Sequence, residues 1–300
     1  MLPLLDCRAA PGRTGAIKMA GRAGVIVMQR AEFVARELSP QIGAEVRTDT
    51  ETLLSGRFAA EIRELLEERG VVVFPQANLS DAQQIAFTET LGVFAPESEE
   101  GGFKLSLDPG ENKYADYLRS GFFWHLDGTM EKLPIRASIL SARRLSPVGG
   151  QTEWANAYSA YEALSDADKE LVGGLRARHT LEALHGSIYP EPSYEQLVEW
   201  REHPSRTLPL VWNHKSGRKS LIVGNTVGYI EGMDRDESRL LLARLRDHTT
   251  QARFVYRHEW QVGDMVMWDN CGTIHRAVRY PADSGRLMYR TKLAGEEAFA

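Results

Sequence analysis

Cysteine is almost absent from this sequence, which has only Cys7 and Cys271 among its 300 residues. Two cysteines in stretches of very different character do not form a disulfide framework, so we expect a reducing, cytoplasmic location. Long hydrophobic runs are also lacking. None reaches the roughly 18–20 residues that a helix needs to cross a bilayer, and no membrane partner is expected.

Excess positive charge is missing as well. Lysine and arginine total 36 against 41 aspartate and glutamate, and the net charge is −5. Charges of both signs are interspersed, so the chain has no basic field that would favour nucleic acid. A hydrophobic content of 43% over this length is enough for one sizeable core.

The first 27 residues differ from the rest in being rich in Gly, Ala and Arg. Their apolar stretch at 23–28 is too short for the core of a signal peptide. We therefore expect residues 1–27 to be a disordered extension, or a start assigned too early with Met28 as the true first residue. A targeting peptide is the less favoured alternative, and residues 28–300 are expected to form a single domain.

Helix signals are clearest in the first third of the chain. Apolar residues at helical spacing predict a helix over 58–69 that ends at Gly70, and residues 71–74 predict a buried strand. Ser80 with Gln83 three residues later forms a capping box that opens another helix.

Two further helices are predicted in the second half. Ser159 with Glu162 has the spacing of a capping box and predicts a helix that continues toward residue 175. Residues 236–248 predict a helix whose buried face is expected to include Leu240, Leu241 and Leu245.

Two stretches lack clear periodicity. Residues 96–119 are polar and contain glycine, which is typical either of a binding loop or lid or of an ordinary surface excursion. Residues 189–205 are rich in Pro and Glu and are predicted to be a loop.

The C-terminal third indicates strands joined by short turns, at residues 254–258, 265–268, 275–280 and 287–293. Together with the helices, these strands predict a mostly β fold with flanking helices. The expected core is a double-stranded β-helix, or jelly roll.

A candidate metal site begins with the sequence Trp124-His125-Leu126-Asp127. On a strand, residues i and i+2 point to the same face, so His125 and Asp127 could converge on one point. Such a tripeptide is common by chance, and a lone histidine on a strand is more often structural than a ligand. A third ligand is needed, and His275 is the candidate because it follows a tight turn at 269–274.

Two histidines and one carboxylate form a facial triad that leaves adjacent coordination positions open on Fe(II), as an oxygenase requires. Arg286 and Arg290 lie four residues apart on the last predicted strand, among apolar neighbours. Burying two arginines is costly unless anions meet them. This face is therefore either exposed to solvent or a site where planar guanidinium groups receive carboxylates.

With these residues in view, the chain resembles the taurine dioxygenase / 2,4-dichlorophenoxyacetate dioxygenase family from about residue 38 to the C-terminus. The order and spacing of several short motifs carry the resemblance, and none of them is decisive alone. The matching stretches are Trp124-His125-Leu126-Asp127, Gly149-Gly150-Gln151-Thr152-Glu153-Trp154, Ala160-Tyr161-Glu162-Ala163-Leu164, Trp268-Asp269-Asn270 with His275, and Arg286 with Arg290.

The resemblance implies that His125, Asp127 and His275 hold Fe(II). It also implies that Thr152 and Arg286 bind the distal carboxylate of the cosubstrate 2-oxoglutarate. Arg290 would meet the anionic head of the substrate, although the two arginines could have exchanged roles. We expect no separate catalytic side chain beyond the metal centre.

The departures from the family pattern bear on the substrate. Taurine enzymes have a histidine after the helix end, but residues 92–97 here contain none. They also have an asparagine three residues before the Trp-His pair, where this chain has Gly121 followed by Phe122 and Phe123. We therefore expect Phe122 and Phe123 to contact a larger, hydrophobic substrate that carries a carboxylate for Arg290.

The implied function is oxidation of a small molecule by O₂, coupled to decarboxylation of 2-oxoglutarate to succinate and CO₂. The intact carboxylate of Asp127 favours hydroxylation over halogenation, because related halogenases lack it. Desaturation, epimerisation or rearrangement on the same scaffold stays open. A non-catalytic sensor that binds metal and 2-oxoglutarate is a further alternative function. The chain could also form a homo-oligomer.

Overall fold

The computed structural model describes residues 25–30 and 32–300. The expectation of a disordered or misassigned extension over 1–27 therefore falls almost entirely outside the described residues. Strand β1 begins at Ile26 and pairs with β2, so regular structure starts two residues before the domain start expected at 28.

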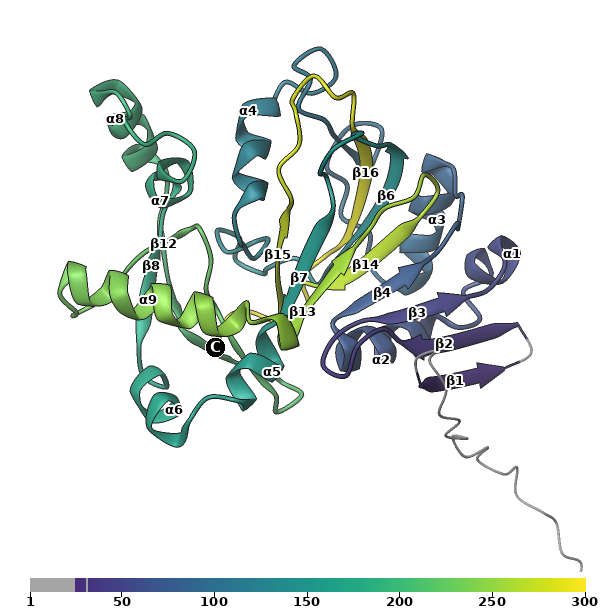
Figure 1. Ribbon diagram of the computed structural model, residues 1–300, viewed down its shortest axis with the longest axis horizontal. Helices are drawn as coiled ribbons and strands as arrows, with labels where there is room; N and C mark the ends of the chain where they lie inside the picture. The colour runs from purple at the N-terminus through teal and green to yellow at the C-terminus, as the bar shows by residue number, and fades with distance from the viewer. Residues whose placement is uncertain (1–24, 31) are drawn as a thin grey trace, which may run out of the picture.

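The fold is mostly sheet, with helices on its flanks (Figure 1). The largest sheet has eight strands, all antiparallel to their neighbours except β3 and β4. In spatial order these are β1 (Ile26–Arg30), β2 (Phe33–Glu37), β3 (Ala44–Arg47), β4 (Val71–Phe74), β14 (Met265–Asp269), β6 (Ala137–Arg144), β16 (Leu287–Leu293) and β5 (Phe103–Leu105).

The N-terminal helices α1 (Thr50–Leu54), α2 (Ala59–Arg69) and α3 (Asp81–Leu91) pack on this sheet. The predictions for α2, α3 and the buried strand β4 are confirmed. Gly70 ends α2 with a φ of 71°, a left-handed conformation that glycine adopts at low cost. The capping box at Ser80 begins α3.

A second sheet carries residues of the candidate site. It consists of β13 (Val255–His258), β7 (Thr152–Asn156) and β15 (Thr273–Ala277). In the antiparallel pairing of β15 with β7, His275 lies opposite Trp154 and Ala277 lies opposite Thr152. All four side chains therefore share one face. Trp154 packs against Trp268 of the large sheet, with ring centroids 5.7 Å apart.

The remaining elements lie mainly on the opposite side of the molecule from α1–α3 (Figure 1). Their strands are β12 (Val227–Ile230), β8 (Arg176–His179), β9 (Arg206–Pro209), β10 (Val211–Asn213) and β11 (Lys219–Leu221). Their helices are α4 (Ala115–Leu118), η1 (Arg119–Phe122), α5 (Ala157–Glu162), α6 (Asp166–Val172), α7 (Leu181–Gly186), α8 (Tyr194–Glu202), α9 (Arg235–Thr249) and η2 (Ala252–Phe254). None of the described helices is long and apolar enough to cross a membrane.

The predicted helix from Ser159 toward residue 175 is wrong. Asn156 caps α5 by accepting from the backbone N–H groups of Tyr158 and Ser159, so Ser159 lies inside the first turn. A new helix, α6, starts after a second cap at Ser165. The N-cap of α5 is therefore Asn156 and not Ser159.

Two smaller predictions also fail. The stretch 189–205 contains α8, which begins with a capping box of Ser193 and Gln196 that its Pro-rich and Glu-rich surroundings concealed. Of the three leucines expected on the buried face of α9, Leu241 and Leu245 are buried as predicted, but Leu240 is exposed. The aperiodic stretch 96–119 holds only the short elements β5 and α4.

Candidate active site

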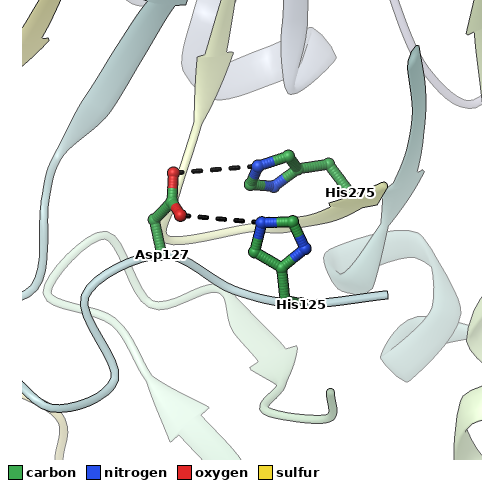
Figure 2. Close-up of side chains that lie close together, drawn as sticks. All are labelled: His125, Asp127 and His275. Carbon is green, nitrogen blue, oxygen red and sulfur yellow. Dashed lines mark ion pairs between the residues drawn. The ribbon is translucent and has the colours of Figure 1, made fainter. Parts of the chain in front are cut away.

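His125, Asp127 and His275 come together in the structure (Figure 2). The sequence suggested a strand around His125. In the structure this segment makes only an isolated bridge to β15. The backbone N–H of His125 donates to the His275 carbonyl at 3.0 Å, and that of His275 donates to the His125 carbonyl at 2.8 Å. This reciprocal pair, together with the turn at Asp127, brings the three side chains together.

The donor atoms fit a metal ion. Nε2 of His125 lies 3.7 Å from Oδ1 of Asp127, and Nε2 of His275 lies 3.7 Å from its Oδ2. Ligand bonds of about 2.0–2.2 Å place neighbouring donors about 3 Å apart, so a small inward shift completes the set. Nδ1 of His125 hydrogen-bonds to the Phe123 carbonyl at 2.8 Å, which leaves its Nε2 free to bind metal.

The deprotonated forms of His275 and Asp127 prevail at neutral pH, and these are the forms that bind a metal. Burial and the neighbouring His125 lower the pKa of His275 to about 3, so its ring is neutral and offers a lone pair. Burial opposes the charge of Asp127, but the neighbouring His275, the cationic Arg290 and His125 outweigh burial and lower the pKa of Asp127 to about 2. The carboxylate is therefore ionised at neutral pH.

The Trp268-Asp269-Asn270 motif is connected to the carboxylate of Asp127 by a chain of hydrogen bonds. The indole N–H of Trp268 donates to Asn270 at 2.8 Å, and the Asn270 amide donates to Ser138 at 2.9 Å. The Ser138 hydroxyl in turn lies 3.4 Å from Oδ2 of Asp127. The motif thus orients a candidate ligand through a chain of side-chain contacts.

Asp269 holds the turn that leads to His275. Its carboxylate is fully buried and pairs with Arg136, whose Nη1 lies 2.5 Å away. It also accepts from the backbone N–H of Cys271 at 2.8 Å. Cys271 is itself buried in this turn, and burial raises the pKa of its thiol.

Arg286 is the unusual charge of this region, because its side chain is only 4% exposed. It donates to the Gly150 carbonyl at 3.0 Å and lies 3.4 Å from the Tyr280 hydroxyl, while its Nε has no partner. It forms no ion pair with any residue in the described ranges 25–30 and 32–300. Burial lowers the pKa of Arg286. A buried guanidinium without a counterion is costly, and an anionic ligand would offset that cost.

A cavity of about 530 Å³ joins Arg286 to the His-Asp-His cluster. Thr152 lines it from the start of β7, and its Oγ1 accepts from the Trp260 indole at 3.0 Å, which leaves the hydroxyl proton available to a ligand. The lining is otherwise largely apolar and aromatic. It includes Phe103, Leu105, Tyr114, Tyr117, Leu118, Phe122, Leu126, Met130, Leu140, Leu181, Leu184, Trp268 and Tyr280.

Only one of the two phenylalanines expected to contact the substrate lines the cavity that contains the metal donors. Phe122 lines the cavity and packs edge-on against Tyr280, with ring centroids 5.4 Å apart. Phe123 does not line this cavity; it lines a larger, neighbouring cleft that extends along α7, α8 and α9. Phe122 lines both spaces, as do Thr180 and Asn225.

Arg290 also lines the cavity, but it has a partner that the sequence did not suggest. Its Nη2 lies 2.6 Å from Oε1 of Glu97 and its Nε lies 3.0 Å from Oε2. Burial opposes the charge of Arg290, but Glu97 and Asp127 outweigh it and raise the pKa. Glu97 precedes Arg290 by 193 positions, and no local pattern marks the pair.

The paired glycines before Thr152 have a steric explanation. A Cβ on Gly149 would lie 2.0 Å from the Arg279 carbonyl oxygen, and a Cβ on Gly150 would lie 3.0 Å from Nε of Arg286. Both residues have positive φ. The Gly-Gly pair therefore allows the backbone to approach Arg286 closely enough to accept its hydrogen bond.

Replacing Gly150 by alanine is expected to displace Arg286 and to weaken 2-oxoglutarate binding by about tenfold, the effect of 1.4 kcal/mol. Calorimetric titration of 2-oxoglutarate into Mn(II)-loaded protein measures this. The matched control is Gly217→Ala, since Gly217 has a φ of 85° and open space around its Cβ position. Equal affinities in the two variants would contradict the steric role of Gly150.

Comparison with known proteins agrees with this geometry. The family model described as "Taurine catabolism dioxygenase TauD, TfdA family" matches residues 35–292. The chain belongs to this family. Within it, the chain is 35% identical over 282 residues to an alpha-ketoglutarate-dependent 2,4-dichlorophenoxyacetate dioxygenase of Cupriavidus pinatubonensis, covering 86% of this chain and 96% of the relative.

Two other TauD/TfdA proteins are similar. An (S)-phenoxypropionate/alpha-ketoglutarate-dioxygenase of Sphingobium herbicidovorans is 31% identical, over 77% of this chain and 84% of the relative. The crystal structure of AAD-2 in complex with Mn(II) and N-oxalylglycine superposes with a TM-score of 0.80 at 32% identity. That alignment covers 89% of this chain and 99% of AAD-2.

Proposed function

We propose that His125, Asp127 and His275 hold the Fe(II) of this dioxygenase and that Arg286 and Thr152 bind its 2-oxoglutarate. The observation that carries the proposal is the buried Arg286, which has no counterion among the described residues and shares a cavity with the three metal donors. An enzyme of this family uses Fe(II) and 2-oxoglutarate (alpha-ketoglutarate), so the expected anion is the cosubstrate.

When bound, Fe(II) activates O₂ and couples decarboxylation of 2-oxoglutarate to succinate and CO₂ with oxidation of a substrate C–H bond. The protein's part is positioning and shielding. Arg286 presents its guanidinium and Thr152 its hydroxyl proton to the distal carboxylate. The apolar lining orients the substrate and keeps water away from the metal.

For the substrate we propose a hydrophobic carboxylate of the aryloxyalkanoate type. The aromatic lining of the cavity suits an aryl ring, and Arg290 suits a carboxylate. The names of the two relatives above point to the same class. Hydroxylation at the carbon beside the ether oxygen would give a hemiacetal, which breaks its C–O bond to release a phenol and an oxo acid.

The test is succinate release by purified protein supplied with Fe(II), O₂ and 2-oxoglutarate over a panel of carboxylates. The panel includes phenoxyacetate, 2-phenoxypropionate, unsubstituted fatty acids and taurine. We expect the aryloxyalkanoates to give the highest rates and to yield equimolar phenol. Fastest turnover with taurine would overturn the substrate class. No 2-oxoglutarate consumption with any compound would favour the sensor alternative.

We further propose that the large sheet and the β13-β7-β15 sheet form a double-stranded β-helix around the site. Packing of Trp154 on Trp268 between the two sheets supports this interpretation. The span of the family match, residues 35–292, supports a single domain over 28–300. The free, buried thiol of Cys271 agrees with a reducing cytoplasm as its location.

A further inference from the structure

Glu97 changes what Arg290 can offer to a substrate. We infer that the carboxylate of Glu97 occupies one of the two edges of the Arg290 guanidinium that can bind a carboxylate. The substrate then meets the single remaining edge and one net positive charge. This subsite selects a monoanionic headgroup, a carboxylate, over a dianion such as a phosphonate. The inference rests on the proposed function and deepens it by fixing the charge of the substrate head.

The hydrogen bonds define the occupied edge. Glu97 receives the Nε–H of Arg290 at 3.0 Å and an N–H of Nη2 at 2.6 Å. A guanidinium has five N–H groups, so both protons of Nη1 and one of Nη2 remain. Nη1 lies 3.7 Å from Oδ2 of Asp127, so the free edge faces the metal cluster. The guanidinium carbon of Arg290 lies 5.6 Å from the centroid of the Phe103 ring, which limits approach from that face.

Lys292 completes the charge balance. It lies two residues after Arg290 on β16, therefore on the same face, and its Nζ is 3.2 Å from Oε1 of Glu97. Two cations and one carboxylate leave this group with a single positive charge. Fe(II), Asp127, dianionic 2-oxoglutarate and Arg286 cancel one another. The groups at the Arg290 end and at the metal end together therefore carry one net positive charge.

Glu97 is held in place by its own backbone. Its N–H donates to the Gly101 carbonyl at 2.8 Å, and the Gly101 N–H donates to Ser98 at 3.0 Å. The Ser98 hydroxyl also donates to the Gly102 carbonyl at 2.6 Å. The Glu97 side chain is only 9% exposed. This tight turn makes the Glu97–Arg290 pair a part of the binding site rather than a surface contact.

The competing arrangement is that Glu97 withdraws to Lys292 when substrate arrives and frees both edges of Arg290. The two arrangements predict different responses to charge changes. In the inferred arrangement, Glu97 remains beside the headgroup and its charge governs the preference for monoanions. In the competing one, the preference is independent of Glu97.

The experiment measures binding without turnover. Protein loaded with Mn(II) and N-oxalylglycine is titrated calorimetrically with phenoxyacetate and with phenoxymethylphosphonate, at a pH above the second ionisation of the phosphonate. The variants are Glu97→Gln, Lys292→Gln and the double variant. The matched control is Glu100→Gln, an exposed glutamate of the same turn that pairs only with Lys104 among the described residues.

Wild type is expected to prefer phenoxyacetate. Glu97→Gln should shift the affinity ratio toward the phosphonate by about tenfold, the effect of one added interaction of 1.4 kcal/mol. Lys292→Gln should shift it the other way, and the double variant should return near the wild-type ratio. Glu100→Gln should leave the ratio unchanged.

An unchanged ratio in Glu97→Gln, or wild type that binds neither probe, would overturn the inference. If one single variant fails to fold by circular dichroism, the other single variant and the double variant still decide. A protein that binds phenoxyacetate with the expected ratios but releases no succinate would leave the inference standing. That result would instead remove the catalytic part of the proposed function.

Discussion

Replacing Asp127 by alanine is expected to abolish turnover and to weaken binding of Fe(II) or Mn(II) by more than about 100-fold. Loss of a residue that merely supports a ligand costs about 10–100-fold, and Asp127 is the only carboxylate in its donor cluster. Removing it also leaves Arg290 without one of its two nearby carboxylates. Metal titration followed by calorimetry and succinate assay measures both effects.

The control for this variant is Asp247→Ala, because the Asp247 side chain is 70% exposed and lies at the end of α9, away from the cluster. It should bind metal and turn over like wild type. Circular dichroism shows whether each variant is folded. A folded Asp127→Ala protein that retains wild-type metal affinity would rule out the proposed metal centre.

Replacing Arg286 by alanine is expected to raise the dissociation constant of 2-oxoglutarate by on the order of 100-fold, because truncating one partner of a buried charge pair costs about 2–5 kcal/mol. Arg286→Lys should fall between alanine and wild type, since lysine keeps the charge and loses the planar fork. Titration of 2-oxoglutarate into the Mn(II)-loaded protein reports this constant directly.

Arg290→Ala distinguishes the two arginines. It should leave 2-oxoglutarate affinity nearly unchanged and raise the KM of the organic acid. The opposite pattern would show that the roles of Arg286 and Arg290 are exchanged. Arg246→Ala, on the exposed face of α9, serves as the control for loss of an arginine.

The sequence predicted much of the candidate site because its chemistry is concentrated in short motifs. The residues of the His125-x-Asp127 motif and His275 meet in the structure, although the expected strand at His125 is absent. A bridge between two distant backbone segments brings them together instead. Arg286 and Arg290 both line the cavity, in agreement with their four-residue spacing in the sequence.

The features of the site that could not be predicted from the sequence are contacts between segments far apart in the chain. Glu97 pairs with a residue 193 positions later in the chain, and it lies in a stretch without periodicity. Trp260 donates to Thr152 across 108 positions. The error in the predicted start of α5 has a local cause. Asn156 lies three residues before Ser159 and caps the helix in its place.

The pairing of β7 with β15 has a consequence for variation of this chain by mutation. Thr152 and His275 share a face only in the observed register, in which Ala277 lies opposite Thr152. Inserting or deleting one residue within either strand would turn every following side chain to the other face. The proposed spacing between the cosubstrate residue Thr152 and the metal residue His275 therefore does not tolerate length changes inside these two strands. Adaptation to new substrates is left to substitutions in the cavity wall and to the loops.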